Sequence, residues 1–64
     1  MPIIHVEMFS GRSCEQKRVL ARELTDAFVR VCGGTPESVT VLFHDVHKED
    51  WAVAGALMAD KYPD

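Results

Sequence analysis

The second residue of this 64-residue chain is the first candidate for chemistry. Pro2 follows Met1, and a methionine before a small residue is expected to be trimmed, which would leave the proline nitrogen as a free secondary amine. A free α-amino group has a pKa of about 7.7–8.0, and burial or nearby cations lower that value. Because a base works best with a pKa near the working pH, Pro2 is a candidate general base. A stable N-terminus without a catalytic role is the competing interpretation.

Two further side chains suit the recognition of a small acid. Arg12 lies in a Gly-Arg turn after a predicted strand, and a guanidinium can bind a carboxylate through two parallel hydrogen bonds. A solvated surface arginine is the competing interpretation. Trp51 is the only tryptophan and lies in the C-terminal tail, so it is expected either to pack in an interface or to form the aromatic wall of a ligand pocket.

The other reactive side chains give weaker signals. His5, His44 and His47 form no dense cluster with cysteines, and the chain has no CxxC motif, so no metal site is expected. Cys14 falls in the first turn of a predicted helix, where the dipole favours a thiolate, but an inert thiol is the preferred interpretation. Neither a metal nor a cofactor is expected.

Hydrophobic periodicity predicts the elements that position these residues. Residues 2–9 alternate as a strand, residues 13–32 carry an apolar stripe at helical spacing, and residues 39–46 form a second strand that is apolar on both faces. Residues 52–58 suit a short hairpin. The fold class predicted for residues 1–64 is therefore a single α/β domain: a βαβ unit with two parallel strands, one long helix and a C-terminal hairpin.

The ends of the helix have their own signals. Ser13 is a predicted N-cap, and Gln16 three residues later completes a capping box. Glycines 33 and 34 are expected to end the helix after Cys32, since glycine accepts the left-handed conformation of a C-terminal cap.

A chain of 64 residues needs additional stabilisation. On folding, a chain of this size buries only about 60% of the surface that its unfolded form exposes. One helix can cover only one face of a two-stranded sheet, which is marginal in water by itself. Cys14 and Cys32 lie about 27 Å apart along the predicted helix, whereas a disulfide needs Cα atoms within about 7 Å. Association with other subunits is therefore predicted, with the second sheet face and the tail buried between them.

Composition argues against several classes of partner. The net charge is −3 without a basic patch, so nucleic acid is not an expected partner. No apolar run is long enough for a transmembrane helix, and no signal peptide is evident, so no membrane partner is expected. Two unpaired thiols suit a reducing compartment, which predicts a cytoplasmic location.

Several short motifs follow one another along nearly the whole chain. They are Pro2-Ile3, Gly11-Arg12-Ser13 followed by Glu15-Gln16-Lys17, Ser38-Val39 at the start of the second strand, and the closing segment from Lys48 to Gly55. Each is weak alone, but their joint order and spacing in so short a chain are fairly specific. Together they resemble the 4-oxalocrotonate tautomerase family.

The resemblance implies a cofactor-free enzyme that acts on a small acidic substrate. It assigns Pro2 as the base that moves a proton between oxygen and carbon of an enol or dienol acid, and Arg12 as the group that binds the substrate carboxylate. Trp51 stands where the family has a pocket aromatic, and Phe9 and Thr40 complete the candidate substrate-binding set. The family assembles as hexamers, trimers of dimers, with sites shared between subunits.

Thr40 is the departure from the family pattern, because the best-known members have an arginine there that polarises the substrate carbonyl. Losing one such electrostatic partner costs about 10²–10³ in rate. Three functions stay open. The first is a keto–enol tautomerase of small unsaturated 2-hydroxy or 2-oxo acids, with a place in aromatic compound degradation. The others are a hydratase or dehalogenase of the same family, and a weakly active or non-catalytic oligomeric subunit.

Overall fold

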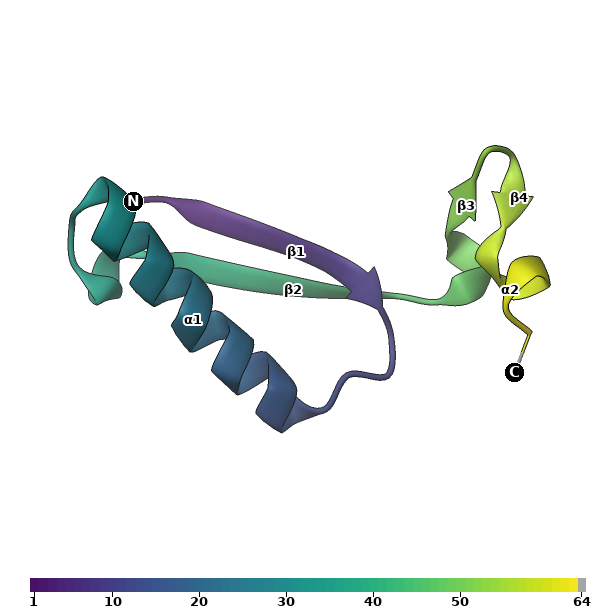
Figure 1. Ribbon diagram of the computed structural model, residues 1–64, viewed down its shortest axis with the longest axis horizontal. Coiled ribbons are helices and arrows are strands. Elements are labelled where there is room, and N and C mark those ends of the chain that lie inside the picture. Colours follow the sequence, from purple (N-terminus) through teal and green to yellow (C-terminus); the bar gives the residue numbers. More distant parts are fainter. Residues whose placement is uncertain (64) are drawn as a thin grey trace.

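The computed structural model describes residues 1–63 and contains the predicted βαβ unit (Figure 1). Strand β1 (Ile3–Phe9) leads into helix α1 (Cys14–Cys32), and strand β2 (Thr40–Val46) returns parallel to β1. A short 3-10 turn, Pro36–Ser38, precedes β2. The predicted fold class is confirmed, and each strand begins one residue later than its predicted start.

Both predicted ends of α1 are confirmed. The Ser13 backbone N–H donates to Oε1 of Gln16 at 2.9 Å, and the Gln16 N–H donates to Oγ of Ser13 at 3.0 Å, which is the reciprocal bonding of a capping box. At the other end Gly33 has φ 86°, and its N–H donates to the Val29 carbonyl at 2.9 Å. A side chain at this φ would be strained, so glycine ends the helix here.

The two faces of the β1–β2 sheet differ in burial. On the face toward α1, Val6 of β1 and Val41 and Phe43 of β2 are half-buried. On the opposite face Ile3 is 66% exposed and Leu42 is 45% exposed, although they alternate with those half-buried residues. We refer to this second face, formed by residues 3, 5, 7 and 9 of β1 and 40, 42, 44 and 46 of β2, as the open face.

The C-terminal segment forms a small unit at the far end of β2 (Figure 1). After the 3-10 turn Lys48–Asp50, strands β3 (Ala52–Val53) and β4 (Ala56–Leu57) form an antiparallel hairpin, followed by helix α2 (Met58–Lys61). The predicted hairpin is confirmed, whereas the 3-10 turn Lys48–Asp50 and α2 were not predicted. The fully buried hydrophobic side chain within the described residues is Met58, 6% exposed, which starts α2 rather than belonging to the hairpin.

The chain is elongated rather than wrapped around one core. Its radius of gyration is 14.9 Å and its extents are 43 × 25 × 15 Å, whereas a compact domain of this length has a radius of gyration of about 11 Å. The accessible surface of 4905 Å² likewise exceeds the about 4,100 Å² of a compact protein of this mass. The apolar surface of both the sheet and the hairpin therefore remains available for contacts outside the chain.

The hairpin turn offers a test of local strain. Its two central residues, Ala54 and Gly55, have φ 54° and 82°, and such turns favour Asn-Gly because both positions need positive φ. We expect Ala54→Asn to raise the free energy of unfolding by about 0.5–1 kcal/mol, since asparagine tolerates this conformation better than alanine. Thermal unfolding would measure the gain. Ala56→Asn, in the adjacent strand, is the control and should not stabilise the chain.

Candidate active site

Pro2 lies at the N-terminal end of the sheet, immediately before β1. It is half-buried, and its carbonyl accepts a hydrogen bond from the Thr40 N–H at 3.0 Å. Met1, by contrast, is 94% exposed. The two strand starts therefore bring the candidate base and Thr40 together, with Pro2 fixed by the sheet and Met1 projecting into solvent. In this form the Pro2 nitrogen is part of a tertiary amide and has no lone pair available for a proton.

Arg12 lies at the other end of β1, in the turn that leads to α1. Its side chain is exposed and has no ion-pair or hydrogen-bond partner within residues 1–63. It lines a hollow of about 220 Å³ whose other walls come from the end of β1 and the first turns of α1: Met8, Gln16, Lys17 and Leu20. An unpaired guanidinium above partly apolar walls is suited to hold the carboxylate of a small organic acid.

Phe9 and Trp51 are also brought together at this end of the strands. Their ring centroids lie 4.5 Å apart with an interplanar angle of 56°, a tilted arrangement that aromatic pairs favour. Trp51 lines a hollow of about 260 Å³ together with Glu7, Val46, Asp50 and Ala52. This contact links the end of β1 to the C-terminal unit.

The five candidate residues therefore fall into two groups at opposite ends of the sheet. Pro2 and Thr40 lie at the strand starts, Phe9 is the last residue of β1, and Arg12 and Trp51 follow the ends of β1 and β2. The seven residues of β1 span about 23 Å at about 3.3 Å per residue. No small acid bridges that distance, so Pro2 and Arg12 of the same chain cannot act on one molecule.

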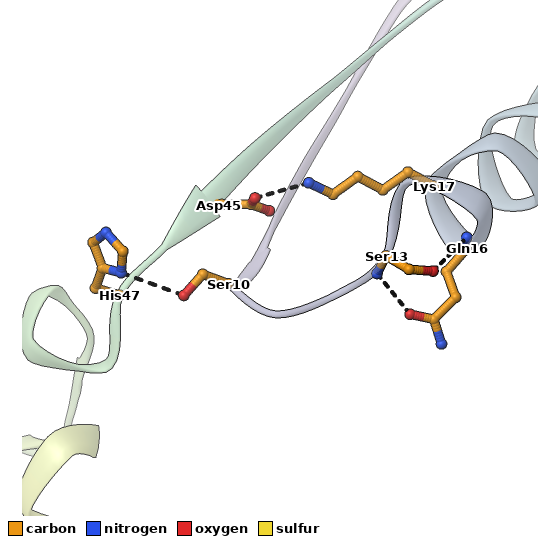
Figure 2. A network of polar contacts seen from close by, with 6 residues as sticks. All are labelled: Ser10, Ser13, Gln16, Lys17, Asp45 and His47. Carbon is orange, nitrogen blue, oxygen red and sulfur yellow. Dashed lines mark hydrogen bonds and ion pairs between the residues drawn. The ribbon is translucent and has the colours of Figure 1, made fainter. Parts of the chain in front are cut away.

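Lys17 is a site-region residue that sequence reasoning missed. Its Nζ donates to Oδ2 of Asp45 at 2.8 Å, which ties α1 to β2 beside the Arg12 hollow (Figure 2). A signal for this contact existed, because Asp45 falls on the same face of β2 as Val41 and Phe43. A carboxylate at the edge of a helix-covered face needs a cationic or hydrogen-bonding partner.

The histidines lie apart from both groups. His44 and Glu7 form an exposed pair on the open face, with Nδ1 and Oε1 3.4 Å apart. His47 shares a hydrogen bond of 3.3 Å with Ser10, shown in Figure 2, beside a hollow of about 440 Å³ that reaches α2. Within residues 1–63 no three His, Cys, Asp or Glu side chains are grouped to hold a metal ion. In the same range no helix has the length and hydropathy to cross a membrane.

Comparison with known proteins places this geometry in an enzyme family. Residues 2–61 match the sequence family described as tautomerase enzyme, so the match begins at Pro2. The chain is 42% identical over 55 residues to a 2-hydroxymuconate tautomerase of Comamonas testosteroni, covering 86% of this chain and 87% of the relative. A probable tautomerase of Ralstonia nicotianae is 36% identical over 61 residues, 95% of this chain and 94% of the relative.

A solved structure supports the same assignment. A heterohexameric 4-oxalocrotonate tautomerase from Chloroflexus aurantiacus superposes with a TM-score of 0.88 at 33% identity, covering 94% of this chain and 97% of the other. The fold is thus that of a short βαβ tautomerase. The chain belongs to the tautomerase family, within the group of 4-oxalocrotonate tautomerase homologues, and it is an isomerase.

The Lys17–Asp45 ion pair yields a prediction about the stability of the chain. The two side chains are 25% and 38% exposed, so the pair is partly screened by solvent and is worth about 0.5–1 kcal/mol. We expect Asp45→Asn and Lys17→Met each to lower the free energy of unfolding by about that amount. Urea unfolding of both single variants and the double variant would measure it, and additive effects would show that the two side chains do not interact.

Proposed function

We propose that the chain is a cofactor-free keto–enol tautomerase of small unsaturated 2-hydroxy or 2-oxo acids, with the Pro2 nitrogen as the general base once Met1 is removed. The observation that carries this proposal is the position of Pro2. The family match begins at this residue, its carbonyl is held at the start of the sheet, and the methionine before it projects into solvent. Removal of Met1 would free the nitrogen without disturbing β1.

The reaction needs only one proton to change place. The Pro2 nitrogen takes the proton of the substrate enol O–H, and the electron pair of that bond forms the carbonyl while the carbon–carbon double bond shifts. A proton then returns from the protonated Pro2 to a carbon of the conjugated chain. One O–H bond breaks, one C–H bond forms, and no electron is gained or lost. A secondary amine with a pKa near neutrality is suited to both halves of this transfer.

The other candidate residues take supporting roles. Arg12 holds the substrate carboxylate, which fixes the orientation of the reacting carbon relative to the base. Trp51 and Phe9 form an apolar wall, and such a wall keeps a neighbouring amine in its neutral form by excluding water. Thr40 lies beside Pro2 and contributes a neutral hydroxyl to the substrate-binding surface.

A complete site then requires more than one subunit. Because Pro2 and Arg12 of one chain lie beyond opposite ends of β1, a strand that spans about 23 Å, the base of one copy acts with the arginine of another. The open face, with Ile3 and Leu42 exposed, gives such copies an apolar surface to bury. A hexamer built as a trimer of dimers is the assembly we propose, and the Chloroflexus aurantiacus relative is described as a heterohexamer.

Thr40 favours a second candidate, a weakly active or non-catalytic subunit of such an assembly. A hydroxyl does not replace a cation that stabilises a developing negative charge. The unpaired Arg12 and the Phe9–Trp51 contact support the active enzyme instead.

The role of Pro2 can be tested with synthetic chains, since 64 residues are within reach of peptide ligation. We expect the chain beginning at Pro2 to isomerise enol acids, and the chain that retains Met1 to be slower by about 10²–10⁴, the usual contribution of a positioned base. Initial rates at matched concentration would measure the difference. A Pro2 chain acetylated on its nitrogen is the control for an amide, and equal rates in all three chains would remove Pro2 as the base.

Shared sites can be tested by mixing two defective chains. Arg12→Ala should lower kcat/KM by about 10- to 100-fold through loss of a charged hydrogen bond, with the circular dichroism spectrum unchanged. The second chain carries Arg12 but an acetylated Pro2. After denaturation and refolding together, random pairing should restore roughly a quarter of the sites in a symmetric assembly. Activity no greater than the sum of the separate chains would contradict shared sites.

A further inference from the structure

The two cations that line the Arg12 hollow differ in whether they already have a partner, and this limits how many carboxylates a substrate can place there. Arg12 has no partner within residues 1–63, whereas the neighbouring cation in its hollow, Lys17, is bound to Asp45 at 2.8 Å. One carboxylate can bind Arg12 without breaking an existing ion pair. A second carboxylate in the same hollow would have to displace Asp45 from Lys17.

The hollow beside Trp51 opposes a second negative charge. Its lining includes two acidic side chains, Asp50 and Glu7, with Val46 and Ala52 as the aliphatic part. Glu7 lies 3.4 Å from Nδ1 of His44, so Asp50 is the acid of this lining without a partner among the ion pairs described above. Arg and Lys side chains are absent from this lining. Like charges a few ångströms apart repel each other, more strongly where water is excluded. An uncharged, flat substituent would instead pack against the indole, which already contacts Phe9 at 4.5 Å.

Thr40 adds no positive charge at the other end. It lies next to Pro2 through the 3.0 Å hydrogen bond from its N–H to the Pro2 carbonyl, and it belongs to the open face. A neutral hydroxyl here can donate or accept a hydrogen bond, but it does not compensate a carboxylate.

We propose that the site selects enol acids that carry one carboxylate and an uncharged aryl or apolar tail, and that Thr40 and Asp50 are the residues that disfavour a dicarboxylate. This inference rests on the proposed function, with Pro2 as base and Arg12 as the carboxylate-binding residue. The hollows beside Arg12 and Trp51 share no lining residue and lie on opposite faces of the sheet, so one substrate would meet these two residues from different copies. The carboxylate binds Arg12 of one copy, the enol carbon faces the Pro2 nitrogen of another, and the tail packs against Trp51 of a further copy.

The test compares two substrates on the processed chain that begins at Pro2. One is the enol form of an arylpyruvate, with one carboxylate, and the other is a 2-hydroxy dienoic acid with a carboxylate at each end. Formation of the keto product gives kcat/KM for each. We expect the arylpyruvate enol to be preferred by at least about 10-fold, the discrimination that one unpaired charged group provides.

Two variants test the residues separately. Thr40→Arg should shift the ratio of kcat/KM values toward the dicarboxylate by about 10- to 100-fold. Asp50→Asn should shift the ratio of kcat/KM values in the same direction by a smaller factor. This second variant keeps the inference testable if Thr40→Arg disturbs the start of β2. Thr35→Arg adds the same charge in an exposed turn, and Glu49→Gln removes the neighbouring acid, which faces the Ser10–His47 hollow instead. Both controls should leave the ratio unchanged.

The outcomes separate this inference from the proposed function. If neither substrate is isomerised by the processed wild-type chain, the proposed function itself fails. If both are isomerised and the dicarboxylate is preferred, or if Thr40→Arg and Asp50→Asn both leave the ratio unchanged, the catalytic assignment stands and the inferred selectivity is wrong. A shift as large in Thr35→Arg as in Thr40→Arg would show a general charge effect and would also overturn the inference.

Discussion

The uncovered face of the two-stranded sheet is the constraint on which the rest of this structure depends. One helix covers one face, and no element within residues 1–63 covers the other, where Ile3 and Leu42 remain exposed. Burial of apolar surface is the main favourable term in folding. An isolated chain that leaves this much apolar surface exposed is therefore expected to be only marginally stable. The separate C-terminal unit and the elongated shape reflect the same shortage of a common core.

Parallel strand order explains how the candidate residues are divided. In a βαβ unit both strands start at one end of the sheet and finish at the other, because the helix carries the chain back between them. Pro2 and Thr40 precede or begin strands and therefore meet. Phe9 ends β1, and Arg12 and Trp51 follow the ends of β1 and β2, so these three lie toward the opposite end. If all five residues belong to one site, as proposed, assembly has to bring the two ends of different chains together.

This division also gives a physical reason for the oligomer besides stability. With the roles proposed for Pro2 and Arg12, a monomer would keep the two residues beyond opposite ends of β1, which spans about 23 Å, and would lack a complete site even if it folded. A single assembly could then meet both requirements: it would bury the open face, and it would bring Pro2 of one chain to Arg12 of another. The mixed-chain experiment addresses the second requirement independently of the first.

Local features were predictable from sequence because they depend on neighbouring residues. The Ser13–Gln16 capping box, the glycine end of α1 and the alternation of the strands all arise within a few positions of the chain, and each was confirmed. Family motifs in their order likewise identified the class of enzyme. The 3-10 turn Lys48–Asp50 and α2 were missed, since segments of three or four residues carry too little periodicity to be recognised.

What only the tertiary structure decided is which distant residues meet. The parallel register placed the Thr40 N–H on the Pro2 carbonyl, the path after β2 placed Trp51 against Phe9, and the approach of α1 placed Lys17 on Asp45. These contacts join residues 28 to 42 positions apart, and no local pattern encodes their distance. By itself the sequence determined the elements and the candidate side chains, and it predicted association with partner subunits. The three-dimensional packing determined that those side chains occupy two ends of one sheet, because strand direction fixes where each end of a strand must lie.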